Sequence, residues 1–293
     1  MERPAAAGAW RCLLRSSEPR LVALDLDGTL LGPAGEVTAR ARATVDALDA
    51  HGVRVVLATG RSPWSAAPIA RRLGLDGPQI LMQGGLVADP VADRPLWATT
   101  MRQELVSEQL AFARERELIP ILGFADAYRA RPLTPDVLEL SWPTYGEGAH
   151  LEIVDSLDAV AGEGPIRTFL FTSPARHAAI AADAAVRFAG RASITWGDEF
   201  GIELLAPGVT KGTALRRLAA ELGIAMDDVA AIGDGRNDLE MLAVAGHSAA
   251  MATAPAAVRA AADVVVPSNA EDGAFVALAS WFPWLPAFAE EAA

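Results

Sequence analysis

The sequence predicts an α/β fold in which a parallel β-sheet core is interrupted by an inserted α+β domain. In the first and last parts of the chain, short and nearly continuous apolar runs alternate with helical patterns. That alternation is typical of a parallel sheet covered by helices on both faces. In the middle of the chain, strands and helices follow one another with hairpin-like links, which favours an α+β unit. With 293 residues, 52% of them hydrophobic, the chain is long enough to build both parts.

These patterns divide the chain into four segments. We expect an N-terminal tail at 1–19, a first core part at 20–86, an inserted domain at 87–205 and a second core part at 206–293.

The first core part is expected to alternate strands and helices. The apolar runs predict buried strands, and a glycine just after each helical pattern marks its end. The elements are the strand Leu21–Leu26, the helix Thr38–His51, the strand Val53–Ala58, the helix Pro63–Leu73 and the short third strand Ile80–Gln83.

The inserted domain begins with a hairpin formed by LVADP and RPLWATT, and Pro132–Gly148, rich in proline and glycine, is expected to be a loop. Its other expected elements are the helix Gln103–Glu117, the strands Ile119–Phe124 and Ile166–Thr172, the helix Pro174–Ala189 and the strands Ser193–Trp196 and Gly201–Leu205.

The strand–helix alternation then resumes. The expected elements are the helix Lys211–Leu222, the strand Val229–Ile232, the helix Arg236–Val244, the strand Ser248–Met251, the helix Pro255–Ala262, the strand Val264–Val266 and a helix from Asp272.

Composition excludes several classes of function. A net charge of -12 disfavours binding to nucleic acid and to anionic membranes, and it requires local positive charge wherever a phosphate binds. The single cysteine, Cys12, allows no internal disulfide and fits a reducing compartment. The N-terminus lacks a continuous apolar region, and Pro283 and Pro286 interrupt the longest apolar stretch. We therefore expect a soluble, cytoplasmic protein.

Four polar clusters stand at expected strand ends or helix starts, where α/β enzymes place their active sites. They are Asp25-Leu26-Asp27-Gly28-Thr29, Thr59-Gly60-Arg61, Lys211 and Gly233-Asp234-Gly235-Arg236-Asn237-Asp238.

Two of these clusters supply carboxylates. Strand periodicity places Asp25 and Asp27 on one side of the chain, and their mutual repulsion calls for a nearby positive charge. Asp234 and Asp238 add oxygen ligands, and a site of oxygens without His or Cys favours Mg²⁺ over Zn²⁺. Lys211, the Thr59 hydroxyl and N–H groups of the glycine turns are candidates to hold a phosphoryl oxygen. Each cluster alone is equally compatible with an ordinary turn, cap or surface residue.

Taken in order, DLDGTL, TGR, K and GDGRND resemble the motifs of the haloacid dehalogenase superfamily of phosphatases. The inserted unit resembles the large α/β cap of that superfamily, known as the C2 type. The segment VVVPSNAEDGAFVAL is similar to the Cof-like subgroup. The resemblance covers about residues 20–280 and implies a Rossmann-like core with a cap.

This resemblance also implies a role for each matching residue. Asp25 is the nucleophile that forms an aspartyl-phosphate, and Asp27 protonates the leaving oxygen and then activates water. The implied Mg²⁺ ligands are Asp25, the Asp27 carbonyl, Asp234 and Asp238. The implied phosphate ligands are Thr59, Gly60, Lys211 and Asn237, and Arg61 is a possible substrate contact.

Two positions depart from the pattern of the superfamily. Gln83-Gly84-Gly85 replaces the frequent Asn-Gly-Ala, and MATA, with Thr253, replaces Met-Gly-Asn-Ala. Both are expected near the cap hinge or the edge of the pocket, away from the catalytic residues.

The expected ligand is a small phosphorylated metabolite, which the cap would select. Aromatic and basic residues of the inserted domain are candidates to contact it, although such aromatics more often belong to a core: Tyr128, Arg131, Trp142, Tyr145, His150 and Trp196. Arg61 either meets the substrate or pairs with a carboxylate. The chain is expected to be a monomer or a homodimer, with Trp281 and Trp284 either at an interface or packed on the core.

Two other functions use the same motifs. A sugar phosphomutase would transfer the phosphoryl group from Asp25 to a sugar hydroxyl, but it needs basic residues in the cap, and residues 87–205 contain no lysine. A non-catalytic protein that binds phosphorylated metabolites would be expected to have lost one of Asp25, Asp27, Lys211 or Asp234, and all four are present.

Overall fold

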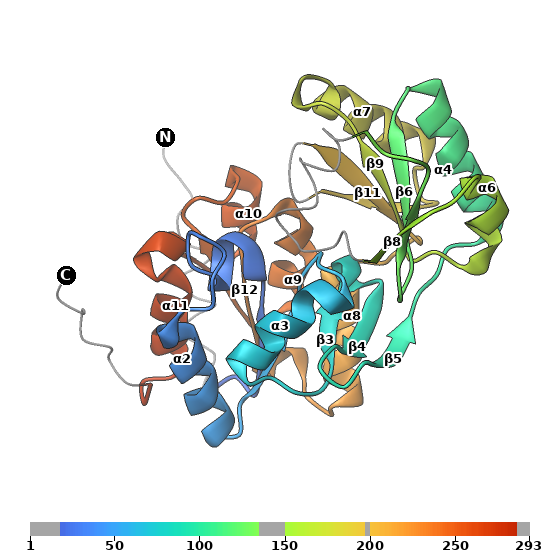
Figure 1. Ribbon diagram of the computed structural model, residues 1–293. Coiled ribbons are helices and arrows are strands. Elements are labelled where there is room, and N and C mark those ends of the chain that lie inside the picture. Colours follow the sequence, from blue (N-terminus) through green and yellow to red (C-terminus); the bar gives the residue numbers. More distant parts are fainter. Residues whose placement is uncertain (1–17, 135–149, 197–199, 286–293) are drawn as a thin grey trace, which may run out of the picture. The chain divides into compact units, whose positions relative to one another are not determined.

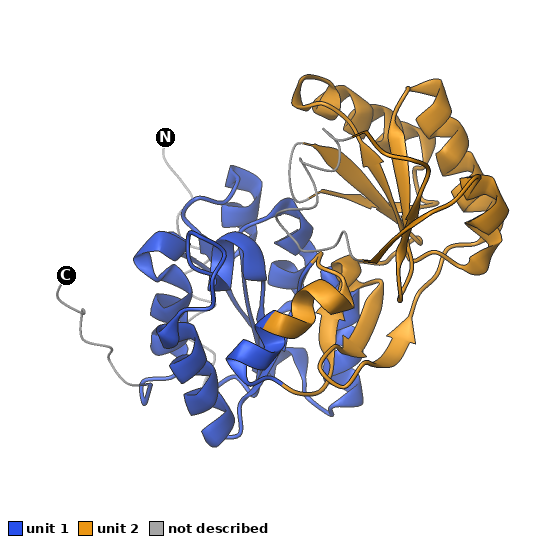
Figure 2. Ribbon diagram, in the orientation of Figure 1, with its two compact units in different colours: residues 1–59, 69–75, 211–293 blue, residues 60–68, 76–210 orange. Residues whose placement is uncertain are grey.

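The computed structural model describes residues 18–134, 150–196 and 200–285 (Figure 1). Cys12, Trp142 and Tyr145 lie outside the described residues, as do most of the expected tail at 1–19 and of the loop Pro132–Gly148. The chain forms two compact units (Figure 2). Unit 1 comprises residues 1–59, 69–75 and 211–293, and unit 2 comprises residues 60–68 and 76–210.

Unit 1 contains a parallel sheet of five strands in the order β14-β13-β12-β1-β2. The strands are β1 (Leu21–Leu24), β2 (Arg54–Leu57), β12 (Val229–Gly233), β13 (His247–Met251) and β14 (Val264–Val266). All four residues of β1 are fully buried, as expected for a central strand flanked on both sides. The predicted α/β core with a parallel sheet is confirmed.

Helices precede or follow these strands in the chain. They are α2 (Ala39–Ala50), α3 (Pro63–Leu73), α8 (Lys211–Glu221), α9 (Leu239–Val244), α10 (Ala256–Ala261) and α11 (Gly273–Trp281). α2 begins where the sequence predicts, because the Thr38 side chain accepts a hydrogen bond from the Ala41 N–H at 3.0 Å and caps the helix. α3 coincides with its expected range and crosses the boundary between the two units. No helix within the described ranges is both long and apolar enough to cross a membrane.

Unit 2 is built on a mixed sheet of six strands in the order β10-β11-β9-β6-β7-β8. Its strands are β6 (Ile119–Gly123), β7 (Tyr128–Ala130), β8 (Leu151–Ile153), β9 (Arg167–Phe171), β10 (Ser193–Thr195) and β11 (Gly201–Leu205). Its helices are α4 (Gln103–Glu115), α6 (Leu157–Val160) and α7 (Pro174–Arg187). Most of these elements were predicted, but the short elements β7, β8 and α6 were not.

The expected third core strand, Ile80–Gln83, is placed differently. β3 (Gln79–Leu81) pairs antiparallel with β4 (Leu86–Asp89), which pairs with β5 (Arg94–Ala98), so the three form a separate sheet. The chain reverses directly after β3, because Gln83 and Gly84 have positive φ angles of 60° and 92°. The expectation that this strand joins the parallel sheet was therefore wrong, since a short apolar run does not specify its partner.

Candidate active site

Two neighbouring strands of the parallel sheet end in aspartates. Asp25 directly follows β1 and Asp234 directly follows β12, and these strands pair with Leu24 opposite Ile232. The Asp25 N–H extends the pairing by donating to the Ile232 carbonyl at 3.0 Å. Because the strands are parallel, both carboxylates stand at the same edge of the sheet, the carboxyl edge.

The turn after Asp25 packs against Asp234. Gly28 has a φ of 81°, and a Cβ atom there would lie 2.5 Å from Asp234 Oδ2, so the turn requires glycine for both backbone conformation and space. The Thr29 hydroxyl donates to Asp234 Oδ1 at 3.1 Å. The DLDGTL motif therefore orients a carboxylate that is 205 residues away in the chain.

Lys211, at the start of α8, joins two of the carboxylates. Its Nζ lies 2.7 Å from Asp25 Oδ1 and 2.7 Å from Asp238 Oδ1, and its side chain is fully buried. Lys211 is also the only lysine in the 293-residue sequence. A buried ammonium is stable only when charged partners surround it, and these two carboxylates supply that compensation.

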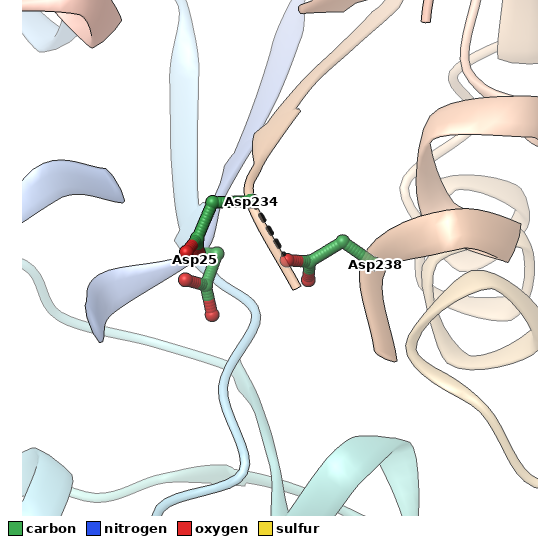
Figure 3. Close-up of side chains that lie close together, drawn as sticks. All are labelled: Asp25, Asp234 and Asp238. Atoms are coloured by element: carbon green, nitrogen blue, oxygen red, sulfur yellow. Dashed lines mark hydrogen bonds between the residues drawn. The ribbon is translucent and has the colours of Figure 1, made fainter. Parts of the chain in front are cut away.

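Asp238 braces the turn that carries Asp234. Its Oδ2 accepts the N–H groups of Asp234 at 3.0 Å and Gly235 at 2.9 Å, while its Oδ1 contacts Lys211. Figure 3 shows the bond from the Asp234 backbone as a dashed line. Asp238 has no solvent exposure, and these three bonds satisfy both of its carboxylate oxygens.

The carboxylates of Asp25, Asp234 and Asp238 form a candidate metal site. One oxygen of each lies within 4.8 Å of the others, and Figure 3 shows the three side chains converging. Three carboxylates and one ammonium sum to a formal charge of about -2 when all are ionised, which a divalent cation would neutralise. Carboxylate oxygens suit a hard cation, so these residues fit the Mg²⁺ expected from the sequence. We call Asp25, Lys211, Asp234 and Asp238 the aspartate–lysine cluster.

Burial and charge shift the pKa values of this cluster. Burial raises the pKa of the Asp25 carboxyl well above its ordinary value; Lys211 opposes this rise, and Asp238 and Asp234 add to it. Burial, followed by repulsion from Asp238, raises the pKa of Asp234 to about 6. Burial alone would lower the pKa of Lys211, but Asp238 and Asp25 outweigh that effect and raise it. Lys211 alone therefore does not neutralise the three carboxylates, and a bound cation would supply the missing positive charge.

Metal binding is expected to stabilise the protein more at pH 8 than at pH 5. The raised pKa of Asp234, about 6, means that the metal-free folded state binds more protons than the unfolded chain does. Its stability therefore falls as pH rises through that region. Above pH 6 a cation offsets the repulsion, whereas at pH 5 it competes with protons. We expect saturating Mg²⁺ to raise the Tm of chelator-treated protein by on the order of 5–10 °C at pH 8 and by much less at pH 5.

Differential scanning calorimetry with and without MgCl₂, at matched ionic strength, measures this difference. Asp234→Asn is the control variant: it removes one proposed metal ligand, so Mg²⁺ should raise its Tm at pH 8 by less than it raises that of the wild type. A Tm gain of the same size at both pH values would contradict the assignment of Asp234 to a cation site.

The raised pKa of Lys211 can be observed directly. Because the chain has one lysine, lysine labelled with ¹³C at Cε gives a single side-chain signal. We expect that signal not to titrate near the ordinary lysine pKa of about 10.4, since Asp238 and Asp25 hold the charged form. In Asp238→Asn it should titrate at lower pH than in the wild type. A wild-type titration at the ordinary value would show that the ion pairs do not form in solution.

The other predicted site residues lie in the expected turns. Thr59 is buried just after β2, where the Ala58 N–H donates to the Leu24 carbonyl at 2.8 Å. Asn237 is half-buried in the turn before α9. Asp27 stands in an extended conformation in the turn after β1 and is not a member of the aspartate–lysine cluster. The expectation that Asp25 and Asp27 share one side rested on strand periodicity, but β1 already ends at Leu24.

Gly60 and Arg61 belong to unit 2, unlike Thr59. The Gly60 carbonyl accepts a hydrogen bond from Arg167 Nη1 at 2.7 Å, and Arg61 Nη1 lies 3.4 Å from the Ser65 hydroxyl. The roles of Thr59, Gly60, Arg61, Asn237 and Asp27 stay predictions.

Three candidate substrate contacts of the inserted domain lie against other aromatic rings. Tyr128 is only 3% exposed and packs in a core cluster of unit 2 with Trp64 against it. His150 is exposed and stacks on Trp64 with ring centroids 4.4 Å apart. Trp196 contacts the ring of His177. Tyr128 is thus a core aromatic.

The sequence predicted no role for Thr29, nor for a buried network in unit 2 formed by Arg167, Glu203 and Gln83. The sequence does contain a signal for two residues of this network. Arg167 and Glu203 each interrupt an apolar strand pattern, in PIRTFLF and GIELL, and charged residues at such positions are rarely buried without a partner.

Comparisons with known proteins point to one family. A family model described as haloacid dehalogenase-like hydrolase matches residues 22–278. The chain is 29% identical over 261 residues to a phosphoglycolate phosphatase of Methanoculleus marisnigri, covering 89% of the chain and 96% of that protein. It is also 29% identical over 274 residues to a chloroplastic endoribonuclease YBEY of Arabidopsis thaliana, covering 89% of the chain. The match spans only 46% of that relative, about half its length.

A solved structure shares the fold. A haloacid dehalogenase-like hydrolase of Bacillus subtilis superposes with a TM-score of 0.78 at 23% identity, covering 89% of the chain and 98% of that structure.

Proposed function

Because the chain belongs to the haloacid dehalogenase-like hydrolases, we propose that it hydrolyses small phosphate monoesters through an aspartyl-phosphate on Asp25. The observation that carries the proposal is the aspartate–lysine cluster at the carboxyl edge of the parallel sheet. The predicted family and the predicted class of enzyme are both confirmed, since the family is one of hydrolases and its curated relatives include named phosphatases.

In the first half-reaction we assign the attack on phosphorus to a carboxylate oxygen of Asp25. The new bond joins that oxygen to phosphorus, and the bond from phosphorus to the ester oxygen breaks. The leaving oxygen takes a proton from the Asp27 carboxyl, so that an alcohol departs. In the second half-reaction Asp27 accepts a proton from water, whose oxygen attacks phosphorus and releases Asp25 and inorganic phosphate.

The charged partners of Asp25 support this assignment. Phosphoryl transfer depends mainly on positioning and on neutralisation of charge. Lys211 contacts Asp25 and is held by Asp238, so its ammonium stands where a transferred phosphoryl group would carry negative charge. A bound Mg²⁺, held by Asp25 and Asp234 and braced by Asp238, would supply the remaining positive charge. Thr59, Gly60 and Asn237 are proposed to bind the phosphoryl oxygens.

Hydrolysis of p-nitrophenyl phosphate tests the reaction, and a panel of phosphorylated metabolites tests its range. We expect release of inorganic phosphate in Mg²⁺ and its loss in chelator, with activity restored by added Mg²⁺. Sugar phosphates, a phosphorylated vitamin and nucleoside monophosphates are the classes to compare. Undiminished turnover in chelator would overturn the metal proposal. Transfer to a sugar without free phosphate would indicate a mutase.

We propose that the segment 87–205 is the cap that selects the substrate. The support is its sequence position between the two core parts and the α+β sheet that its residues form. A reducing, cytoplasmic location and a monomeric or homodimeric state stay predictions. Trp284 is stacked on His51 at 3.8 Å between ring centroids, so one face of its ring is used within unit 1.

A further inference from the structure

Unit 2 contains a buried ion pair that the catalytic proposal does not use. Arg167 opens β9 and Glu203 lies on the antiparallel neighbour β11. Arg167 Nη1 is 2.5 Å from Glu203 Oε2, and the two side chains are 8% and 6% exposed. The other carboxylate oxygen, Oε1, accepts the Gln83 side-chain N–H at 2.8 Å. Buried ion pairs add little stability compared with apolar residues, so this pair suggests another purpose.

The same guanidinium reaches the turn that follows Thr59. Arg167 Nη1 donates to the Gly60 carbonyl at 2.7 Å, and Nη2 donates to the Tyr128 hydroxyl. The Met82 N–H donates to the next carbonyl along the turn, that of Arg61, at 3.0 Å. Both carbonyl groups after Thr59 are therefore tied to residues of unit 2.

Gly60 has no space for a side chain on the side that faces Gln83. A Cβ atom on Gly60 would lie 2.4 Å from the Gln83 side-chain nitrogen, and the bond to Glu203 holds that nitrogen in place. Gly60 is thus packed against Gln83 at its α-carbon and bonded to Arg167 at its carbonyl. Gln83 stands at a position that departs from the pattern of the superfamily, and here it belongs to the same network.

We propose that Arg167 is a positioning residue that holds the phosphate-binding turn Thr59-Gly60-Arg61 through the Gly60 carbonyl. The proposal rests on the proposed function, because it takes Thr59 and Gly60 to bind the phosphoryl group. Glu203 balances the charge of Arg167, which is why the guanidinium fixes a carbonyl instead of binding the phosphate itself. Glu203 and Gln83 hold the Arg167 side chain beside Gly60.

Kinetics of the Mg²⁺-loaded enzyme test this role. Arg167→Met combined with Glu203→Gln removes the hydrogen bond from Arg167 to the Gly60 carbonyl, which we call the tether. It leaves no unpaired buried carboxylate. We expect KM and the inhibition constant of inorganic phosphate to rise about tenfold, as for loss of one charge-assisted hydrogen bond, with the Mg²⁺ concentration for half-maximal activity unchanged. Arg129→Met is the matched control, because Arg129 lies on β7 of the same sheet and pairs with two glutamates, Glu152 and Glu163, at 2.7 Å each. Arg129→Met should leave KM and the inhibition constant of inorganic phosphate unchanged.

Arg167→Lys provides a second variant that decides the question if the double variant does not fold. It keeps a charge beside Glu203 but lacks the forked guanidinium, so its KM should lie between those of the wild type and the double variant. Wild-type constants in the double variant or in Arg167→Lys, or an equal rise in Arg129→Met, would overturn the proposal.

A spectroscopic readout separates this proposal from the proposed function. Glycine labelled with ¹³C at the carbonyl and arginine labelled with ¹⁵N give signals only from Gly–Arg peptide bonds, of which the sequence has three: Gly60–Arg61, Gly190–Arg191 and Gly235–Arg236. In the Arg167 variants the Gly60 carbonyl signal should shift while the Gly190 signal stays in place. An unmoved Gly60 signal would overturn the tether. A shifted signal in a protein whose wild type releases no phosphate would leave the tether standing and would overturn the proposed function.

Discussion

Asp25→Asn is expected to reduce kcat/KM for p-nitrophenyl phosphate by on the order of 10⁴-fold or more, as loss of a nucleophile does in other enzymes. An amide oxygen does not attack phosphorus as a carboxylate does. The substitution nearly preserves the shape of the side chain, and the Lys211 ammonium can still donate to the oxygen of the introduced amide. Initial rates of phosphate release in Mg²⁺, with the enzyme concentration fixed by titration, measure the loss.

The stability of this variant distinguishes lost chemistry from lost structure. Asp25→Asn leaves the ion pair between Lys211 and Asp238 in place, and it removes one of the charges that repel Asp234 and Asp238. The Tm of chelator-treated Asp25→Asn should therefore stay within about 5 °C of that of the wild type. Asp46→Asn, which changes an exposed carboxylate paired with Arg42, is the control and should keep full activity. A kcat/KM within tenfold of wild type in Asp25→Asn would refute Asp25 as the nucleophile.

Lys211→Met is expected to lower the free energy of unfolding by about 3–5 kcal/mol at pH 8, the cost of removing one partner from a buried ion pair. The substitution leaves Asp25 and Asp238 without their shared cation, in surroundings where both are nearly inaccessible to solvent. Without Lys211 the carboxylates hold protons to higher pH, so the loss should be smaller at pH 5 than at pH 8. Urea unfolding at the two pH values measures both effects.

Two companion variants test whether this loss arises from the ion pairs. Arg217→Met removes an exposed cation from the same helix, α8, where Arg217 pairs with Glu221 at 3.2 Å. It should cost no more than about 1 kcal/mol, as exposed pairs do. Asp25→Asn combined with Lys211→Met should lose less than the sum of the single changes, because one stranded carboxylate is gone. Equal urea midpoints for Lys211→Met and the wild type would show that the buried pairs do not contribute.

Much of the fold could be predicted because its signals are local. Thr38 precedes α2 and caps it, and the predicted range Pro63–Leu73 coincides with α3. Such signals depend on residues within one or two turns of each other. β3 shows the limit: its apolar run predicted a strand correctly but not its sheet, because the turn at Gln83 and Gly84 gave it β4 as an antiparallel partner.

The candidate site shows the same division. Local periodicity was enough to predict that the members of the aspartate–lysine cluster stand at strand ends or helix starts. The folded chain was needed to show that one ammonium bridges Asp25 and Asp238, and that Thr29 orients Asp234. Lys211 and Asp25 are 186 residues apart, and no local pattern specifies a contact over that separation. The packing of parallel strands into one sheet brings their carboxyl ends together, and the burial of that edge requires its charges to pair.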